Sequence, residues 1–283
     1  MKSIVKVIPG KSISRIGSRL PDGTTGIFYS PKEKAVGFYC HSDGMIGFAK
    51  DDGTVKIVTR RLEIPAPAGA CCDRWGIVLF QSSKEMLWGF DQSCESGARM
   101  CGARTFSSMA TVLADPGQPP YGVCRTGSAT ILIAIPGANV VAQIANGSYR
   151  RLLESGKRGF LSSTVASSSM FDSPCGVCFD PGTDTLFVSD TGNGVVRAFR
   201  GGKEVSFLGM PGSAGFADGV GTMARFWSPS ASCCDRGNVA VCDRNLVRTF
   251  GASSLDVGTP YASSGTVLGV AAWDGATYVL EET

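Results

Sequence analysis

Short hydrophobic runs, separated by turns rich in Gly, Pro, Asn and Asp, follow the same order several times along the chain. In residues 173–199 a Pro precedes a strand of small residues, followed by a turn, a strand ending in Asp, a second turn and a strand ending in Arg-x-Phe. The same order recurs at 228–250, 119–144, 66–90 and, with more divergence, 23–49. Short runs of this kind are typical of β-strands joined by tight turns. The chain is therefore predicted to repeat one small β unit.

The last repeat is incomplete at the C-terminus, and the N-terminus supplies its missing half. Residues 265–283 provide only two strands, whereas residues 2–17 resemble the third and fourth strands at 194–209. Six copies with the last one split in this way predict a closed ring, because joining both ends in one sheet leaves no open edge. The expected fold is all-β: a six-bladed β-propeller of four-stranded antiparallel blades. Its last blade is closed by residues 2–17 joining 265–283, and residues 1–283 form a single domain.

Each copy places a small residue in its first, innermost strand. These residues are Gly26, Gly69, Gly122, Gly176, Ala231 and Gly269. Their spacing of roughly forty to fifty-five residues suits four strands and the turns between them. The fourth, outermost strands are predicted near 13–16, 54–59, 104–110, 149–153, 204–208 and 254–257.

The sequence resembles the NHL-repeat family in two segments. Residues 171–199, FDSPCGVCFDPGTDTLFVSDTGNGVVRAF, match the family's Pro-x-Gly-Val, Leu-x-Val-x-Asp and Asn-x-x-Ile-Arg-like pattern. Residues 215–231, GFADGVGTMARFWSPSA, are similar to the connector that often links NHL blades. The match is specific over 171–250, fair over 119–144 and weak elsewhere. The resemblance implies a six-bladed propeller but no particular activity, because NHL propellers include lyases, hydrolase relatives, RNA binders and interaction platforms.

Composition narrows the possible environments and chemistries. The net charge of +3 is too small to indicate nucleic-acid binding by itself. The N-terminal residues contain no apolar core of signal-peptide length, and no apolar run reaches the length of a membrane span. We therefore expect a protein that is not classically secreted, is intracellular or part of a particle, and has no membrane partner. The single histidine, His41, leaves little imidazole for metal or acid–base chemistry.

The Cys-x-x-Cys at 175–178 is interpreted as part of the repeat. Aligning the copies puts four cysteines at one position of the innermost strand: Cys71, Cys124, Cys178 and Cys233. Equivalent positions in different blades are held apart, so a packing role is favoured over zinc binding. Vicinal cysteines point to opposite strand faces and should not bond each other. Cys94 and Cys101, in a glycine-rich connector, are the candidates for exposed thiols.

Three second strands end in a carboxylate, namely those with Asp190, Asp243 and Glu281. Carboxylates gathered at one channel mouth could bind a divalent cation. The alternative, which we favour, is that an Asp before a turn accepts backbone N–H bonds and fixes that turn. Glu281 lacks the nearby Asn that such a turn uses, so its role is the least explained.

Three third strands carry a basic residue: Lys6, Arg197 and Arg248. They are expected at matching positions of the aligned repeats, which makes them a candidate RNA-binding stripe. No aromatic residues are interleaved with them for base stacking, so solvated surface charge is the favoured interpretation and nucleic acid is not an expected partner.

These observations favour a non-catalytic scaffold that binds other proteins. The chain carries no cofactor motif and no set of histidines, so no cofactor is expected. A structural subunit of a larger assembly, such as a virus or phage particle, is the first hypothesis. The alternatives are a metal-dependent enzyme that resembles propeller lactonases or lyases, with a site near Asp190, Asp243 and Glu281, and an RNA-binding propeller.

Overall fold

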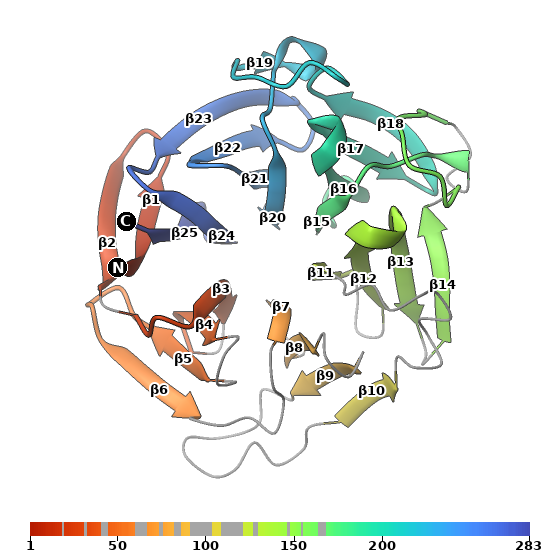
Figure 1. Ribbon diagram of the computed structural model, residues 1–283. Helices are drawn as coiled ribbons and strands as arrows, with labels where there is room; N and C mark the ends of the chain where they lie inside the picture. Colours follow the sequence, from red (N-terminus) through yellow and green to blue (C-terminus); the bar gives the residue numbers. More distant parts are fainter. Residues whose placement is uncertain are drawn as a thin grey trace.

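The strands are arranged radially around a central opening (Figure 1). The computed structural model describes residues 1–18, 20–30, 33–40, 45–59, 67–73, 76–81, 86–90, 104–108, 121–126, 130–145, 148–153, 155–163 and 168–283. No helix in this part of the chain has the length and apolar character that a membrane span requires.

The described strands form five four-stranded antiparallel sheets and one five-stranded sheet. The first three sheets in chain order contain β3 (Thr24–Ser30), β4 (Ala35–Cys40), β5 (Ile46–Ala49) and β6 (Val55–Thr59); β7 (Pro67–Asp73), β8 (Gly76–Gln81), β9 (Met86–Phe90) and β10 (Arg104–Ser108); and β11 (Gly122–Arg125), β12 (Thr130–Ile135), β13 (Val140–Ala145) and β14 (Ser148–Leu153). The next contains β15 (Pro174–Asp180), β16 (Thr185–Asp190), β17 (Val195–Arg200) and β18 (Lys203–Leu208). The five-stranded sheet contains β19 (Gly219–Val220), β20 (Pro229–Asp235), β21 (Asn238–Asp243), β22 (Leu246–Gly251) and β23 (Asp256–Ala262). The sheet that joins the termini contains β24 (Thr266–Trp273), β25 (Ala276–Glu282), β1 (Lys2–Ile8) and β2 (Ser12–Ser18).

The expectation of six four-stranded blades is wrong. Only five of the sheets in the described residues have four strands, because β19 pairs with the outer edge of β23 and makes that blade five-stranded. The outermost strand expected at 254–257 is also displaced, since β23 runs over Asp256–Ala262. The additional strand arises in the connector that precedes β20, which folds back onto the rim of the ring instead of crossing directly to the centre.

The two ends of the chain close the ring within one blade. β1 pairs with β25 over six residue pairs, from Lys2↔Glu282 to Val7↔Thr277. The N–H of Thr283 also donates to the carbonyl of Met1 at 3.0 Å. The labels N and C lie side by side in Figure 1. Because neither β1 nor β25 has an unpaired inner edge, closure removes the two edges that a linear array of blades would expose.

The core is divided into clusters that lie between neighbouring blades. Phe187 of β16 meets Phe250 of β22 edge to face, with ring centroids 5.4 Å apart. Val196 and Phe226 belong to the same buried cluster. On either side of the closing strands, Ile4 packs in one cluster and Val5 in another, as alternation along a strand requires. The described clusters therefore join neighbouring blades through apolar contacts, from the blade of β11–β14 through the closing blade to that of β3–β6.

Small residues in the first strands allow neighbouring blades to approach each other at the centre. A Cβ added at Gly176 would lie 2.0 Å from the carbonyl oxygen of Ser230 in the next blade. A Cβ added at Gly122 would lie 2.3 Å from the carbonyl oxygen of Cys175. Real Cβ atoms do not approach backbone oxygens this closely, so Gly122 and Gly176 reflect backbone-to-backbone packing of adjacent first strands.

We expect Gly176→Ala to lower the free energy of unfolding by about 1–3 kcal/mol, because the added methyl group must push two first strands apart. Gly258→Ala is the matched control, since nothing lies within 4 Å of a Cβ added there. Equilibrium unfolding in urea measures both. Equal stability of the two variants would show that the first strands can separate without loss.

Candidate functional site

The two faces of the ring differ in which turns and connectors they contain. Because consecutive strands in a blade are antiparallel, the turns after the first and third strands lie at one end of the blade, as at 181–184 and 201–202. The turn after the second strand, at 191–194, lies at the other end together with the connectors between blades. We call the second end the connector face. The best-described connectors there are residues 155–173 and 209–228.

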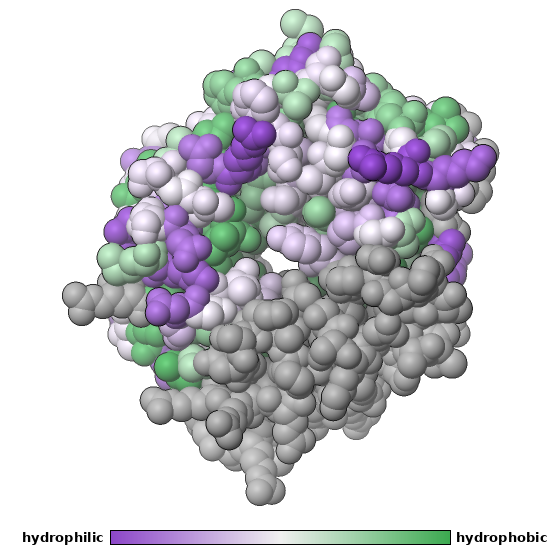
Figure 2. All heavy atoms as spheres, in the orientation of Figure 1, coloured by the Kyte–Doolittle hydropathy of each residue, from purple (hydrophilic) through white to green (hydrophobic). Residues whose placement is uncertain are grey.

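A central cavity of about 550 Å³ is lined by the first strands. Its walls include Gly26, Gly122, Gly176, Ala231 and Gly269. Figure 2 shows the opening in the middle of the ring. Its titratable lining groups, within the described residues, are those of Lys2, Tyr39, Tyr121 and Glu282.

Lys2 at this cavity already has partners. Its Nζ donates to the carbonyls of Asp22 at 2.6 Å and Thr24 at 2.8 Å. The rest of the described lining consists mainly of small, hydroxyl and aliphatic side chains.

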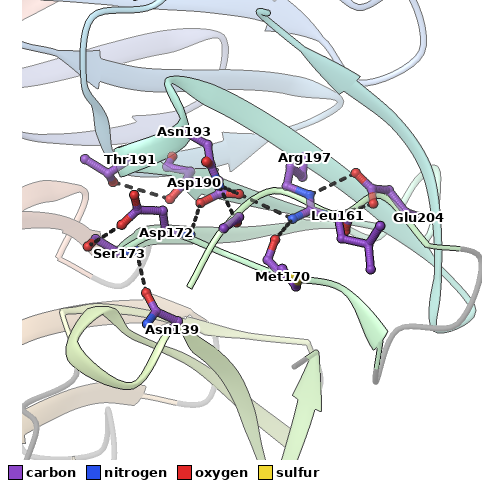
Figure 3. A network of polar contacts seen from close by, with 12 residues as sticks. Asn139, Leu161, Met170, Asp172, Ser173, Asp190, Thr191, Asn193, Arg197 and Glu204 are labelled. Carbon is purple, nitrogen blue, oxygen red and sulfur yellow. Dashed lines mark hydrogen bonds and ion pairs between the residues drawn. The ribbon is translucent and has the colours of Figure 1, made fainter. Parts of the chain in front are cut away.

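Asp190, at the end of β16, ties the incoming connector to its blade (Figure 3). One carboxylate oxygen accepts the N–H of Asp172 at 2.8 Å. The other accepts Nδ2 of Asn193 at 2.8 Å and Nη1 of Arg197 at 3.3 Å. Burial raises the pKa of Asp190 to about 6, against the opposing effect of these donors. Asn193 belongs to the turn after β16 and the N–H group of Asp172 belongs to the connector, so Asp190 holds its own turn through a side chain and the connector through the backbone.

Arg197 of β17 completes this arrangement as a buried clamp (Figure 3). Its side chain is 0% exposed. Nη1 donates to the carbonyl of Met170 at 2.5 Å and Nη2 to that of Leu161 at 2.9 Å. Leu161 and Met170 are themselves paired by an antiparallel bridge. Glu204 accepts from Nε at 2.9 Å and from Nη2 at 2.6 Å. The guanidinium also lies 4.4–5.5 Å from the ring centroids of Phe160, Phe171 and Phe199.

The next blade repeats the clamp. Arg248 donates from Nη1 to the carbonyl of Arg225 at 2.7 Å and from Nη2 to that of Ala217 at 2.6 Å. These two residues are joined by an antiparallel bridge. Asp243 lies 3.3 Å from Nη1, and Asp218 lies 2.9 Å from Nη2.

Asp243 also holds the residues that lead into β20, the first strand of its own blade. It accepts the N–H of Trp227 at 2.9 Å and that of Ser228 at 2.7 Å. The second clamp differs from the first at Nε of Arg248, which has no hydrogen-bond acceptor among the described residues. Glu204 fills this place beside Arg197.

The three basic residues do not form a surface stripe. Arg197 and Arg248 are buried, so their interpretation as solvated surface charge is wrong. They lie opposite Val188 and Val241, two residues before the carboxylates of their strands. Lys6 is not their equivalent in the register.

In the closing blade the residue opposite position 279, two before Glu281, is Val5. Lys6 therefore lies on the opposite face of β1, where it forms an ion pair with Asp51. Arg15 of β2, opposite Val5, provides the guanidinium instead. Burial of Arg197 and Arg248 removes them as phosphate contacts.

Glu281 is fully satisfied by neighbours within its own region. Its Oε1 accepts from Nη2 of Arg15 at 3.0 Å and from Oγ of Ser3 at 3.2 Å. Its Oε2 accepts from the hydroxyls of Tyr261 at 2.7 Å and Ser263 at 2.6 Å. Burial favours the neutral acid, but these donors outweigh it and lower the pKa of Glu281 below its usual value. Its role is to join β25 to β2 and to the end of β23.

The carboxylates do not converge on a common point. Asp190, Asp243 and Glu281 each bind donors of their own blade and connector. In the part of the chain that the structure describes, no three His, Cys, Asp or Glu side chains are grouped to hold a metal ion. None of the three carboxylates belongs to the described lining of the central cavity.

The repeat-position cysteines occupy one place in the register. Each pairs with the residue three positions before the end of the second strand, as in Cys178↔Phe187 and Cys233↔Ala240. Cys124 and Cys178 are buried and Cys233 is half-buried, while Cys71 lies on β7, where the structure does not describe side chains. Cys233 and Cys234 pack in different clusters, as expected for opposite strand faces. His41, Cys94 and Cys101 lie outside the described residues.

Burial also affects thiol chemistry. It raises the pKa of Cys178 and that of Cys242, so both stay protonated at neutral pH. Cys175 is half-buried, donates to the carbonyl of Ser173 at 3.4 Å, and has a pKa raised by burial. The Cys175–Cys178 pair is therefore not an activated redox motif.

We expect Arg197→Met to lower the free energy of unfolding by about 3–5 kcal/mol, because it removes the cation beside two buried carboxylates and the donor to two connector carbonyls. The control is Arg236→Met, since Arg236 pairs with Asp274 at the surface, where both side chains are about two-thirds exposed. That change should cost less than about 1 kcal/mol. Similar losses in the two variants would contradict the clamp's structural role.

We expect iodoacetamide at mildly alkaline pH to leave Cys178 and Cys242 unmodified in the folded protein and to modify both in guanidinium chloride. The thiolate is the reactive form, and burial suppresses both its formation and its access. Peptide mass spectrometry measures each site. Rapid native labelling of Cys178 would show that the centre of the ring opens easily.

The fold is shared with several solved β-propeller structures. No protein-family model matches the sequence, and no curated protein matches it. A chain of a nidogen/laminin complex is 14% identical, with 92% of this chain and 93% of that chain covered and a TM-score of 0.62. A gluconolactonase from Xanthomonas campestris is 15% identical, with 97% and 91% covered and a TM-score of 0.62. Virginiamycin B lyase from Staphylococcus aureus is 12% identical, with 100% of both chains covered and a TM-score of 0.55. At these identities the likeness establishes the propeller fold alone.

Proposed function

We propose that this propeller is a non-catalytic scaffold that binds other proteins as a structural subunit of a larger assembly, for which a virus or phage particle is one setting. The supporting observation is the clamping of the connectors. Arg197 and Arg248 each bind two connector carbonyls and are fully buried. Clamped connectors hold their outward side chains in fixed positions, and a preorganised surface binds with a smaller loss of conformational entropy.

We also infer a relationship to NHL repeats, on the basis of what the matching residues do. The Asp, Asn and Arg of the motif in residues 171–199 are Asp190, Asn193 and Arg197, which together join one connector to one blade. A motif with this structural task is compatible with many functions, so the relationship supports a shared architecture.

An enzyme that resembles lactonases or lyases is the second candidate. It is favoured by the fold shared with a gluconolactonase and a lyase, and by the central cavity of about 550 Å³. Asp190, Asp243 and Glu281 are poor ligands for such a site, because each is already bonded to an arginine and to further donors. A metal at the cavity would need ligands other than these three.

Two measurements on the full-length protein distinguish the candidates. Affinity purification from the cells or particles that produce the protein, with quantitative mass spectrometry, is expected to recover stoichiometric protein partners. Metal analysis of the purified protein and a lactone-hydrolysis assay are expected to give no bound cation and no turnover. A stoichiometric cation with lactone turnover, or recovery of the free monomer alone, would reject the scaffold proposal.

A further inference from the structure

Exposed apolar side chains gather in one connector of the ring. Of the thirteen large hydrophobic residues that are exposed within the described chain, five lie between residues 210 and 227. They are Met210, Phe216, Val220, Met223 and Trp227, which we call the 210–227 patch. Figure 2 shows apolar surface around the β19 segment at the top of the view. Single exposed apolar residues are ordinary, but such a concentration in one segment is typical of an interaction surface.

The backbone that carries the patch is fixed on all sides. The N–H of Gly221 donates to Leu255 at 3.0 Å, and the N–H of Gly215 donates to Phe226 at 3.1 Å. β19 pairs with β23, and the carbonyls of Ala217 and Arg225 are bound by buried Arg248. The patch is therefore part of the ordered rim.

Most of these apolar side chains are not needed for the clamp. Phe216 lies 5.1 Å from the guanidinium of Arg248 and shields it, as Phe160 shields Arg197 at 5.0 Å in the other connector. Val220 and Met223 lie on the excursion between the bridged residues Ala217 and Arg225. Both point to solvent, and Met223 is 71% exposed. Packing within the ring does not explain them.

Two arginines border the patch without an acidic partner. Arg225 donates through Nη1 to backbone carbonyls and through Nη2 to Sδ of Met210 at 3.5 Å. The guanidinium of Arg244 lies 4.5 Å from the ring centroid of Trp227. Neither arginine forms an ion pair with any residue that the structure describes.

None of the acidic neighbours that the structure describes pairs with Arg225 or Arg244. Asp218 is engaged by Arg248 and by the hydroxyl of Thr259, at 2.8 Å. Asp256, opposite Val220, is the remaining exposed carboxylate beside the patch. The guanidinium groups of Arg225 and Arg244 are therefore the cations that this apolar surface offers to a partner, and arginine beside tryptophan is a frequent combination at the centre of protein interfaces.

We propose that the 210–227 patch is the docking surface of this scaffold, and that it binds a protein segment whose apolar side chains are flanked by Asp or Glu. This proposal rests on the scaffold function proposed above. The apolar side chains of the segment cover Val220, Met223 and Trp227, and its carboxylates pair with Arg225 and Arg244. Carboxylates are bound strongly by arginine next to a desolvated surface.

The test begins with a selection from a phage-displayed library of random linear peptides against the full-length protein. The expected binders combine Leu, Phe, Trp or Met with several Asp or Glu residues. Met223→Ser and Arg244→Ser should each weaken a selected peptide by about thirty-fold, as truncation of an interface hot spot does. The control Ile13→Ser, at a residue that is 59% exposed on β2, should leave binding unchanged.

Thermal unfolding of each variant checks that the fold is retained, since all of these side chains are at the surface. No enriched peptide, basic peptides, or binding that survives both patch substitutions would overturn the proposal. Concentration-dependent self-association in sedimentation velocity that is lost in Met223→Ser would also overturn it, because a second copy would then occupy the patch.

Affinity purification with the Met223→Ser variant separates this proposal from the general one. Partners that are recovered with the unchanged protein but not with the variant support both. Partners that are recovered equally with both proteins would overturn the patch and leave the scaffold function standing.

Discussion

The antiparallel pairing of β1 with β25 is the constraint on which the rest of the ring depends. Each blade packs only against its two neighbours. A ring that stays open would therefore leave apolar blade faces in water, together with the unpaired edges of β1 and β25. The six residue pairs between these strands join the first and last residues of the chain, and they place Ile4 and Val5 in clusters on both sides of the closing blade. The closing blade thereby connects the stability of the first blade to that of the last.

Buried charge is tolerated in this ring because each guanidinium is almost completely satisfied. Arg197 has two carboxylates, two backbone carbonyls and three aromatic rings around it, which replaces the water it has lost. Arg248 lacks only an acceptor at Nε among the described residues. In the closing blade the buried carboxylate of Glu281 also pairs with an arginine, but from another strand. Val5 occupies the place of the arginine on β1, and Arg15 of β2 reaches Glu281 instead. The clamp therefore depends on the arrangement of donors around a carboxylate rather than on one strand position.

Hydrophobic periodicity was sufficient to predict the repeats, the first-strand glycines and the closure by the terminal strands. It could not reveal β19, because Gly219–Val220 is a two-residue strand without any alternation. An arginine on a strand normally faces solvent, so the sequence predicts Arg197 and Arg248 at the surface, whereas both are buried. The informative signal was the combination of Asp before the turn, Arg after it and phenylalanines in the preceding connector. Lys6 is not the counterpart of Arg197, because the ungapped alignment of residues 2–17 with 194–209 pairs Val5 with Arg197, and the register of β1 on β25 agrees.

The two clamps also explain how one face of such a ring can acquire a function without disturbing the fold. What Arg197 and Arg248 bind in each connector is mainly backbone carbonyl, together with a shielding phenylalanine. Apart from Asp218, whose carboxylate pairs with Arg248, the residues between Ala217 and Arg225 are therefore free to vary in sequence, since their side chains contribute little to the clamp. In the connector of residues 209–228, two of these variable positions hold Val220 and Met223. Water solvates both side chains poorly, and the fixed backbone cannot move to bury them. Folding leaves these apolar side chains in water, so the favourable free energy of burying them becomes available when a partner binds.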